Sequence, residues 1–187
     1  LVAEPGDGGA ETGRWLYTRR LHAAETGLAE ALRPLRASPP PPRARQPEAD
    51  GARWKRFNEA QRQAVCAAFR NGVSIITGGP GVGKTTVVGE VVAQARRLQM
   101  RVLLAAPTGR AAKRMSESCS LEAKTLHRLL KWDPARGAFI HDADTPLRGD
   151  LLVVDEVSML DVELARNLFT AVPAGTQVQC VAADITT

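Results

Sequence analysis

The sequence is poor in aromatic residues, and it contains no long apolar run. Phenylalanine, tryptophan and tyrosine together make up 4% of the 187 residues. No stretch reaches the roughly 18 apolar residues that a transmembrane helix needs, and the N-terminus lacks the basic and apolar regions of a secretory signal. The sequence therefore predicts no membrane partner. It also begins without a methionine, so we expect a fragment of a longer protein.

Cysteine is scarce as well, with Cys66, Cys119 and Cys180 far apart in the chain. Their number is odd and no CxxC pair occurs, which argues against a disulfide framework and a zinc site. We expect buried, reduced thiols, as in the cytoplasm. The formal net charge of +5 is compatible with a nucleic-acid partner. The cations are spread along the chain, so charge alone supports that partner only weakly.

Proline divides the chain. Four consecutive prolines in "RASPPPPRARQPEADGAR" favour an extended spacer, which we place at residues 37–53. Residues 1–36 form the end of an N-terminal helical region, in which leucines at helical spacing predict a short amphipathic helix over 15–35. This helix either belongs to a region upstream or packs on the main domain, residues 54–187.

Apolar, β-branched runs alternate with helical patterns in the main domain. Strands are predicted within 73–79, 101–109, 150–156 and 176–184, and helices over 58–69, 84–99, 110–118, 123–132 and 161–172. Alternation of this kind predicts an α/β fold with a parallel sheet and helices on both faces.

The stretch "GGPGVGKT" satisfies the phosphate-loop pattern G-x-x-x-x-G-K-[ST], with Gly78, Gly83, Lys84 and Thr85 at the fixed positions. Glycines let backbone N–H groups approach phosphate oxygens, and the start of a helix favours an anion. The pattern follows a predicted strand and opens a predicted helix, which is the expected context. It predicts a nucleotide site in which Lys84 reaches the β- and γ-phosphates and Thr85 holds Mg²⁺. The expected binding residues are Gly79, Pro80, Gly81, Val82, Gly83, Lys84, Thr85 and Thr86.

A pair of acids, Asp155 and Glu156, ends the predicted strand "LLVV". Ligands of open α/β sheets bind outside the carboxyl ends of the strands. An acid pair alone would indicate only a solvent-facing strand end, but the phosphate loop upstream favours a catalytic role. We expect Asp155 to bind the Mg²⁺ carried by ATP and Glu156 to act as the base toward water.

Three further stretches, "APTGRAAKRM", "KTLHRLL" and "DEVSMLD", join "FNEAQRQAV" and the phosphate loop in an ordered set. This set resembles the first motor domain of superfamily 1 DNA helicases, and most closely the RecD-like family, over residues 16–178. The resemblance implies a RecA-like P-loop NTPase fold for residues 54–187. It also implies an ATP- and Mg²⁺-dependent helicase that moves 5′ to 3′ on single-stranded DNA and serves DNA repair or recombination.

The resemblance also implies roles for single residues. Gln61 corresponds to the glutamine that reads adenine, with Gln63 as the alternative and a solvated helix position as the simpler interpretation. Contacts to DNA are implied for Pro107, Thr108, Gly109, Arg110, Thr125 and His127.

Several of these residues have simpler alternatives. His127 could be a core or capping residue. Arg110, Lys113 and Arg114 form one basic cluster that either contacts the DNA backbone or is a solvated face. Trp132 and Phe139 could stack on bases, but we expect them to pack in the core.

The sequence departs from the family near its end. The family's Gly-Asp falls on Ala182 and Ala183, and its phosphate-sensing glutamine falls on Thr186; Asp184 could replace the aspartate only after a register shift. The second motor domain, which supplies arginines to the ATP site, is not in the sequence. We therefore expect slow or undetectable hydrolysis and no unwinding by this chain alone. We also expect an open sheet edge, marginal stability and some aggregation.

Two other functions remain open. A non-catalytic P-loop module could bind nucleotide or DNA without chemistry. A P-loop kinase would need an acceptor site and a lid, and the sequence shows no such lid. Whether the parent protein is monomeric or part of a recombination complex is also open.

Overall fold

The computed structural model describes residues 2–5, 14–39 and 54–183. The chain starts with an antiparallel pair of strands, β1 (Val2–Pro5) and β2 (Arg14–Tyr17), followed by helix α1 (Arg19–Ala37). Our prediction of a helix from residue 15 is wrong at its start, because residues 15–17 belong to β2. The helix begins later because the Thr18 side chain caps it by accepting a hydrogen bond from the Leu21 N–H. Residues 40–53, most of the expected spacer, lie outside the described residues.

A five-stranded parallel sheet forms the centre of the chain. Its strands lie in the order β3-β9-β8-β4-β5. Their bounds are β3 (Val73–Ile76), β4 (Val102–Ala106), β5 (Ala123–Thr125), β8 (Leu151–Val154) and β9 (Gln177–Val181). This confirms the predicted α/β class. The prediction of a helix over 123–132 is wrong for the three residues of β5, since only α5 (Leu126–Leu130) is helical there.

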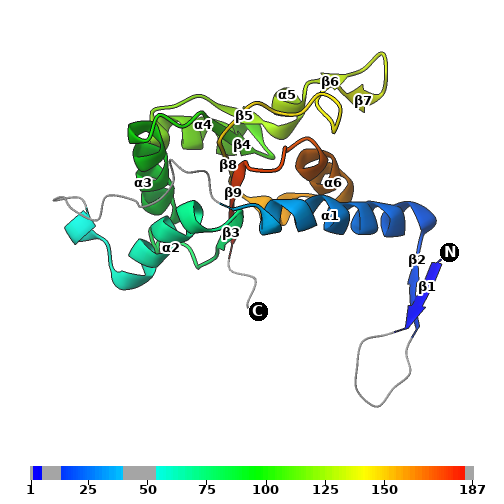
Figure 1. Cartoon of the computed structure of the whole chain (residues 1–187), viewed down its shortest axis with the longest axis horizontal. Coiled ribbons are helices and arrows are strands. Elements are labelled where there is room, and N and C mark those ends of the chain that lie inside the picture. Colours follow the sequence, from blue (N-terminus) through cyan, green and yellow to red (C-terminus); the bar gives the residue numbers. More distant parts are fainter. Residues whose placement is uncertain (1, 6–13, 40–53, 184–187) are drawn as a thin grey trace.

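Helices cover both faces of the sheet, as predicted (Figure 1). Helices α2 (Glu59–Arg70), α3 (Lys84–Arg97) and α4 (Gly109–Cys119) lie on one face, and α1, α5 and α6 (Val162–Thr170) lie on the other. Side chains alternate along a strand, so β8 contributes to both cores. Leu151 and Val153 belong to the first core, and Leu152 and Val154 belong to the second.

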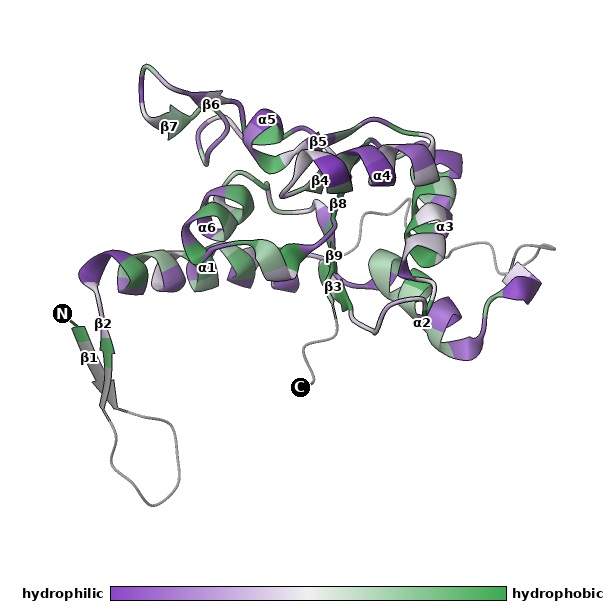
Figure 2. Ribbon diagram, turned by 180° about the vertical axis from the view of Figure 1, so that it is seen from behind, coloured by the Kyte–Doolittle hydropathy of each residue, from purple (hydrophilic) through white to green (hydrophobic). Residues whose placement is uncertain are grey.

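Helix α1 packs against α6 (Figure 2), which decides between the two alternatives for this helix in favour of contact with the main domain. Leu35 is 1% exposed and belongs to the second core. The chain approaches Gly72 so closely here that a Cβ atom on Gly72 would lie 1.9 Å from the Leu35 carbonyl oxygen. The Gly175 N–H also donates a hydrogen bond to the Ser38 hydroxyl over 3.2 Å.

The remaining elements are short. The 3₁₀ turns are η2 (Trp54–Arg56) and η3 (Val157–Met159), and β6 (Trp132–Asp133) pairs with β7 (Ala138–Phe139). Trp132 is 45% exposed, so its predicted place in the core is wrong; Phe139 does pack against the second core. Trp132 stays outside because its strand belongs to this small hairpin and not to the main sheet.

Strand β3 lies at one edge of the main sheet, where Ile75 is 66% exposed. The expected marginal stability and aggregation stay predictions. Within the described part of the chain, no helix is long and apolar enough to cross a membrane.

Replacement of Leu35 by alanine tests the docking of α1. We expect the free energy of unfolding to fall by about 2–5 kcal/mol, because removal of this fully buried side chain leaves a cavity in the second core that α1 helps to form. Urea unfolding followed by circular dichroism measures the change. Leu21→Ala, at a site 46% exposed on the same helix, is the matched control and should cost much less. Equal, small effects of both changes would contradict this packing.

Candidate functional site

The phosphate loop connects β3 to α3 and closes with a glycine in a left-handed conformation. Gly83, the N-cap of α3, has φ 88°. A Cβ atom there would lie 2.7 Å from Nε2 of Gln61, so a larger residue would both strain the backbone and displace that amide. The Lys84 ammonium lies over the loop and donates to the carbonyl oxygens of Gly78 and Gly79, the latter at 3.0 Å. The local sequence thus holds the loop open toward the start of the helix.

The acid pair follows β8 at the same edge of the sheet. The Asp155 N–H donates to the Ala105 carbonyl over 2.9 Å, which continues the pairing with β4 by one residue. Glu156 then has φ 54° and ψ 39°, a left-handed conformation that costs a non-glycine residue about 1–2 kcal/mol. Strain of this kind concentrates at functional sites. It turns the chain out of the sheet and into η3.

The phosphate loop and the acid pair line one cavity of about 460 Å³. They meet because β3 and β8 are parallel and separated by β9 alone, so their carboxyl ends lie at the same edge. Of the predicted nucleotide residues, those on the cavity wall are Gly79, Pro80, Gly81, Gly83, Lys84 and Thr85, whereas Val82 and Thr86 are exposed outside it.

The end of β9 contributes Val181, Ala182 and Ala183 to the same cavity. Ala182 and Ala183 therefore face the site, and each contributes a methyl group to it. Asp184, which could replace the family's aspartate only after a register shift, and Thr186, at the position of the family's glutamine, lie outside the described residues.

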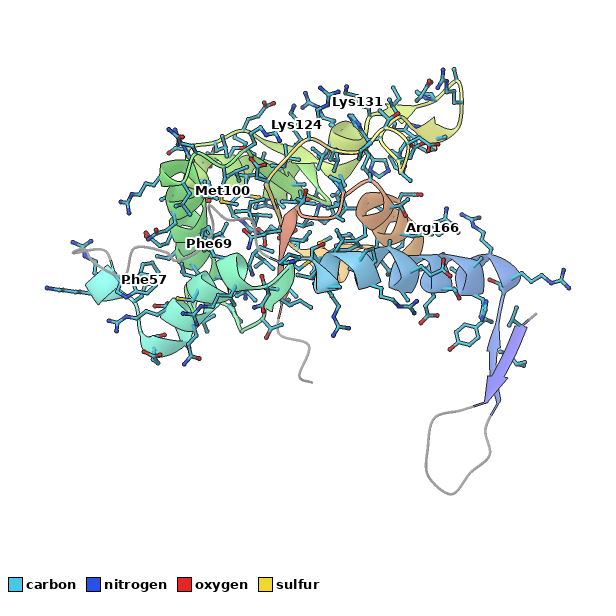
Figure 3. All side chains as sticks on the ribbon, viewed as in Figure 1. Phe57, Phe69, Met100, Lys124, Lys131 and Arg166 are labelled. Carbon is cyan, nitrogen blue, oxygen red and sulfur yellow. The ribbon has the colours of Figure 1, made fainter. Side chains whose placement is uncertain are left out.

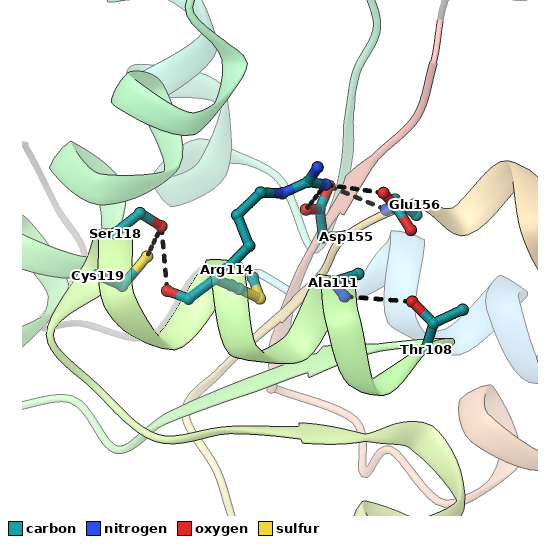
Figure 4. A network of polar contacts seen from close by, with 8 residues as sticks. Thr108, Ala111, Arg114, Ser118, Cys119, Asp155 and Glu156 are labelled. Carbon is teal, nitrogen blue, oxygen red and sulfur yellow. Dashed lines mark hydrogen bonds and ion pairs between the residues drawn. The ribbon is translucent and has the colours of Figure 1, made fainter.

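Arg114 also lines this cavity, which the sequence analysis missed. Its Nη2 atom lies 2.7 Å from Oε1 of Glu156 and 3.6 Å from Oδ2 of Asp155 (Figure 4). The prediction of one basic cluster is wrong for this residue. Lys113 points elsewhere and lies 4.0 Å from Glu117, because adjacent residues of a helix face different directions. No local pattern in the sequence marks Arg114, because its place on the cavity wall depends on how α4 packs.

Gln61 connects the start of α2 to the phosphate loop. The side-chain oxygen of Gln61 accepts a hydrogen bond from the Asn58 backbone N–H over 3.1 Å. The Gln61 backbone N–H donates to the Asn58 side-chain oxygen, so the two residues form a capping box. Nε2 of Gln61 donates to the Val82 carbonyl over 3.1 Å. Gln63 instead bonds Glu59 on the exposed side of the helix. The contact to adenine stays a prediction, but between the two glutamines it is Gln61 that touches the loop.

The predicted DNA-contacting residues gather at the carboxyl ends of β4 and β5. The last residues of these strands, Ala106 and Thr125, are paired, so the loop from Pro107 and the start of α5 are neighbours. Thr108 and Thr125 have the same structural role, since each side-chain oxygen accepts a backbone N–H and caps the helix that follows. Gly109 and Arg110 are exposed.

His127 is exposed, and its ring lies 5.6 Å from that of Phe139. It is therefore not a core residue, and the Thr125 side chain, not His127, caps α5.

The three cysteines are free thiols. Burial raises the pKa of Cys180 to about 12 and also raises the pKa of Cys119. The prediction of buried thiols is confirmed for these two, whereas Cys66 is half-buried.

Comparisons with known proteins agree with this geometry. Residues 61–184 match the family described as AAA domain. The chain is 38% identical over 176 residues to the ATP-dependent RecD2 DNA helicase of Deinococcus radiodurans, an alignment that covers 89% of this chain and 23% of the relative. It is 37% identical over 147 residues to the RecD subunit of the RecBCD enzyme of Mycolicibacterium smegmatis, covering 66% of this chain and 26% of that subunit.

A solved structure of two coordinating Pif1 helicases at forked double-stranded DNA is similar with a TM-score of 0.46 and 22% identity. The alignment covers 70% of this chain and 35% of the Pif1 chain. The chain thus spans about a quarter of the length of the curated relatives named above.

The left-handed backbone of Glu156 predicts that a glycine variant is more stable than an alanine variant, the reverse of the usual order in a helix. Glu156→Gly should be more stable than Glu156→Ala by about 1 kcal/mol, since glycine adopts the left-handed conformation without strain. At the exposed helical position Glu117 the same pair of variants should show the opposite order, with glycine about 1 kcal/mol less stable. Urea unfolding of the four variants measures both differences. The same order at both positions would show that Glu156 is unstrained.

Proposed function

Since the chain belongs to the AAA domain family that its residues 61–184 match, we propose that it is the ATP-binding part of the first motor domain of a RecD-like, ATP-dependent DNA helicase. The observation that carries this proposal is the shared cavity of the phosphate loop and the acid pair. A loop of backbone donors faces two carboxylates there, which is the arrangement that nucleotide hydrolysis needs.

Different residues of the cavity would bind the phosphates, hold Mg²⁺ and activate water. Backbone N–H groups of residues 79–83 and the Lys84 ammonium hold the phosphates. Thr85 and Asp155 fit Mg²⁺, because both line the cavity and both offer oxygen ligands. The described residues contain no cluster of three His, Cys, Asp or Glu side chains around a metal, so phosphate oxygens and water would complete the coordination. Glu156 has the carboxylate that orients water and takes its proton.

Single-stranded DNA is the proposed partner, at the neighbouring ends of β4 and β5. Pro107, Thr108, Gly109, Arg110, Thr125 and His127 lie there, and the exposed residues among them can reach phosphates. A second cavity of about 610 Å³ beside β5 supports a polyanionic partner. Its cationic residues are Lys124, Arg128, Lys131 and Arg148, of which Figure 3 labels two.

The finer properties rest on the relatives. Movement from 5′ to 3′, coupling of hydrolysis to translocation and a role in repair or recombination follow from likeness to RecD proteins, some of which are RecBCD subunits. The parent therefore works either alone or in such a complex. The free thiols fit a cytoplasmic location.

A non-catalytic nucleotide-binding module is the second candidate, and one observation favours it for the chain as it stands. Ala182 and Ala183 occupy a wall of the cavity and offer no carboxylate. Binding of the phosphates needs the loop, whereas efficient hydrolysis needs further polar groups around the terminal phosphate.

Titration of the chain with Mg²⁺ and a fluorescent ATP analogue tests the proposal. We expect saturable binding. Lys84→Ala should weaken it at least tenfold, because the variant loses the charge-assisted hydrogen bonds between the ammonium and the phosphates. ATP turnover, with and without oligothymidine, is measured on the same samples. The account predicts turnover close to the Lys84→Ala blank.

One outcome of the turnover assay separates the two candidates. DNA-stimulated turnover well above the blank would exclude the binding module and show that this chain suffices for catalysis. Binding that Lys84→Ala leaves unchanged would contradict a nucleotide site at the phosphate loop.

A further inference from the structure

Arg114 is a charged residue of the cavity wall that lies outside both the phosphate loop and the acid pair. It lies on α4, whose exposed side carries the Lys113–Glu117 ion pair, while Arg114, Met115 and Ser118 face the cavity. The guanidinium contacts the Glu156 carboxylate at 2.7 Å and lies 3.6 Å from Asp155 (Figure 4). It is thus attached to the acid pair and to no part of the phosphate loop that the structure describes.

The charges of the cavity explain why a cation is needed at that place. Among the described lining residues, the cations are Lys84 and Arg114, and the anions are Asp155 and Glu156. Lys84 is engaged with loop carbonyls, so it neutralises the loop end. Two carboxylates at the other end would repel the terminal phosphate of a bound triphosphate. Arg114 offsets that repulsion on its own side of the cavity.

The guanidinium also has capacity left for a ligand. It has five N–H donors and no acceptor, and its contact with Glu156 uses one of the two on Nη2. Its side chain is 61% exposed, so it can turn without breaking a packed core. A phosphate between the loop and the acid pair would be a geometrically suitable acceptor, because guanidinium groups bind phosphate through two parallel hydrogen bonds.

From these contacts we infer that Arg114 is a specificity-determining residue, which recognises the terminal phosphate of a nucleoside triphosphate from within this domain and positions Glu156 beside it. The inference rests on the proposed nucleotide site. It assigns to α4 the task of distinguishing a triphosphate from a diphosphate. Arg114→Gln should therefore weaken the triphosphate selectively.

Binding of ADP and of a non-hydrolysable ATP analogue, each with Mg²⁺, tests this on the 187-residue chain. For Arg114→Gln we expect the triphosphate affinity to fall about tenfold, the loss typical of one charge-assisted hydrogen bond, and the ADP affinity to change less than about twofold. Arg114→Lys should fall between, since it keeps the charge and loses the planar fork. Lys113→Gln, on the exposed side of the same helix, is the matched control and should bind both nucleotides as the unchanged chain does.

A double-mutant cycle with Glu156→Gln adds a readout that a purely structural role would not move. Removing the carboxylate frees Arg114 for the phosphate, so Glu156→Gln should strengthen triphosphate binding, and this gain should vanish in the double variant. Circular dichroism confirms that each variant is folded.

The following results for Arg114→Gln would overturn the inference. An equal loss for ADP and the triphosphate would show that Arg114 supports the pocket as a whole, and no loss would show that it only neutralises the acids. If the unchanged chain binds neither nucleotide, the proposed function fails together with the inference. If the unchanged chain binds both and Lys84→Ala binds neither, the proposed function stands and the inference is decided by Arg114 alone.

Discussion

The parallel pairing of β9 with both β3 and β8 brings the phosphate loop and the acid pair to the same edge of the sheet. Ile76 pairs with Val181, and Val154 pairs with Cys180, so three strand ends are level at one edge of the sheet. A hydrogen bond of 2.9 Å from the Ala182 N–H to the Ile76 carbonyl extends this pairing to the cavity. Both faces of the sheet are buried under helices, which leaves the carboxyl edge as the place where polar groups meet.

Strand β9, an interior strand of the sheet, also carries buried polar side chains. Gln177 and Gln179 are 1% and 0% exposed, and Gln179 accepts a hydrogen bond from the Ser74 hydroxyl over 3.2 Å. The side-chain amide of Gln177 has no partner among the described residues, which costs about 1–3 kcal/mol for such a buried group. The surrounding apolar packing must offset this cost, so the site depends on the two cores that hold β9 in register.

The sequence predicted the elements whose signals are local. The phosphate loop, the acid pair and the alternating order of strands and helices follow from short patterns, and their meeting in one cavity follows from the rule for parallel sheets. Strand β5 could not be predicted from its three residues, because pairing with β4 makes it a strand and the adjoining "LHRLL" makes it look helical. The hairpin β6–β7 was not predicted, because strands of two residues are too short to show a period-2 pattern.

The role of Arg114 was beyond the sequence for a geometric reason. Lys113 and Arg114 are adjacent in the chain, but successive residues of a helix differ in direction by about 100°, so Lys113 pairs with Glu117 and Arg114 pairs with Glu156. Which face of α4 meets the acid pair depends on its packing against α3 and β4. Conversely, Gln61 had a clear sequence signal through the family resemblance, and the structure adds that the same side chain braces the loop.

The phosphate loop and the acid pair are distant in the sequence, and replacement of Mg²⁺ by Mn²⁺ can measure whether they form one metal–nucleotide site. Electron paramagnetic resonance of Mn²⁺ is recorded with and without an ATP analogue for the unchanged chain, Thr85→Val and Asp155→Asn. The account predicts a nucleotide-dependent Mn²⁺ signal in the unchanged chain that either substitution weakens, because one oxygen ligand comes from each motif. A signal that survives both substitutions would contradict a shared site.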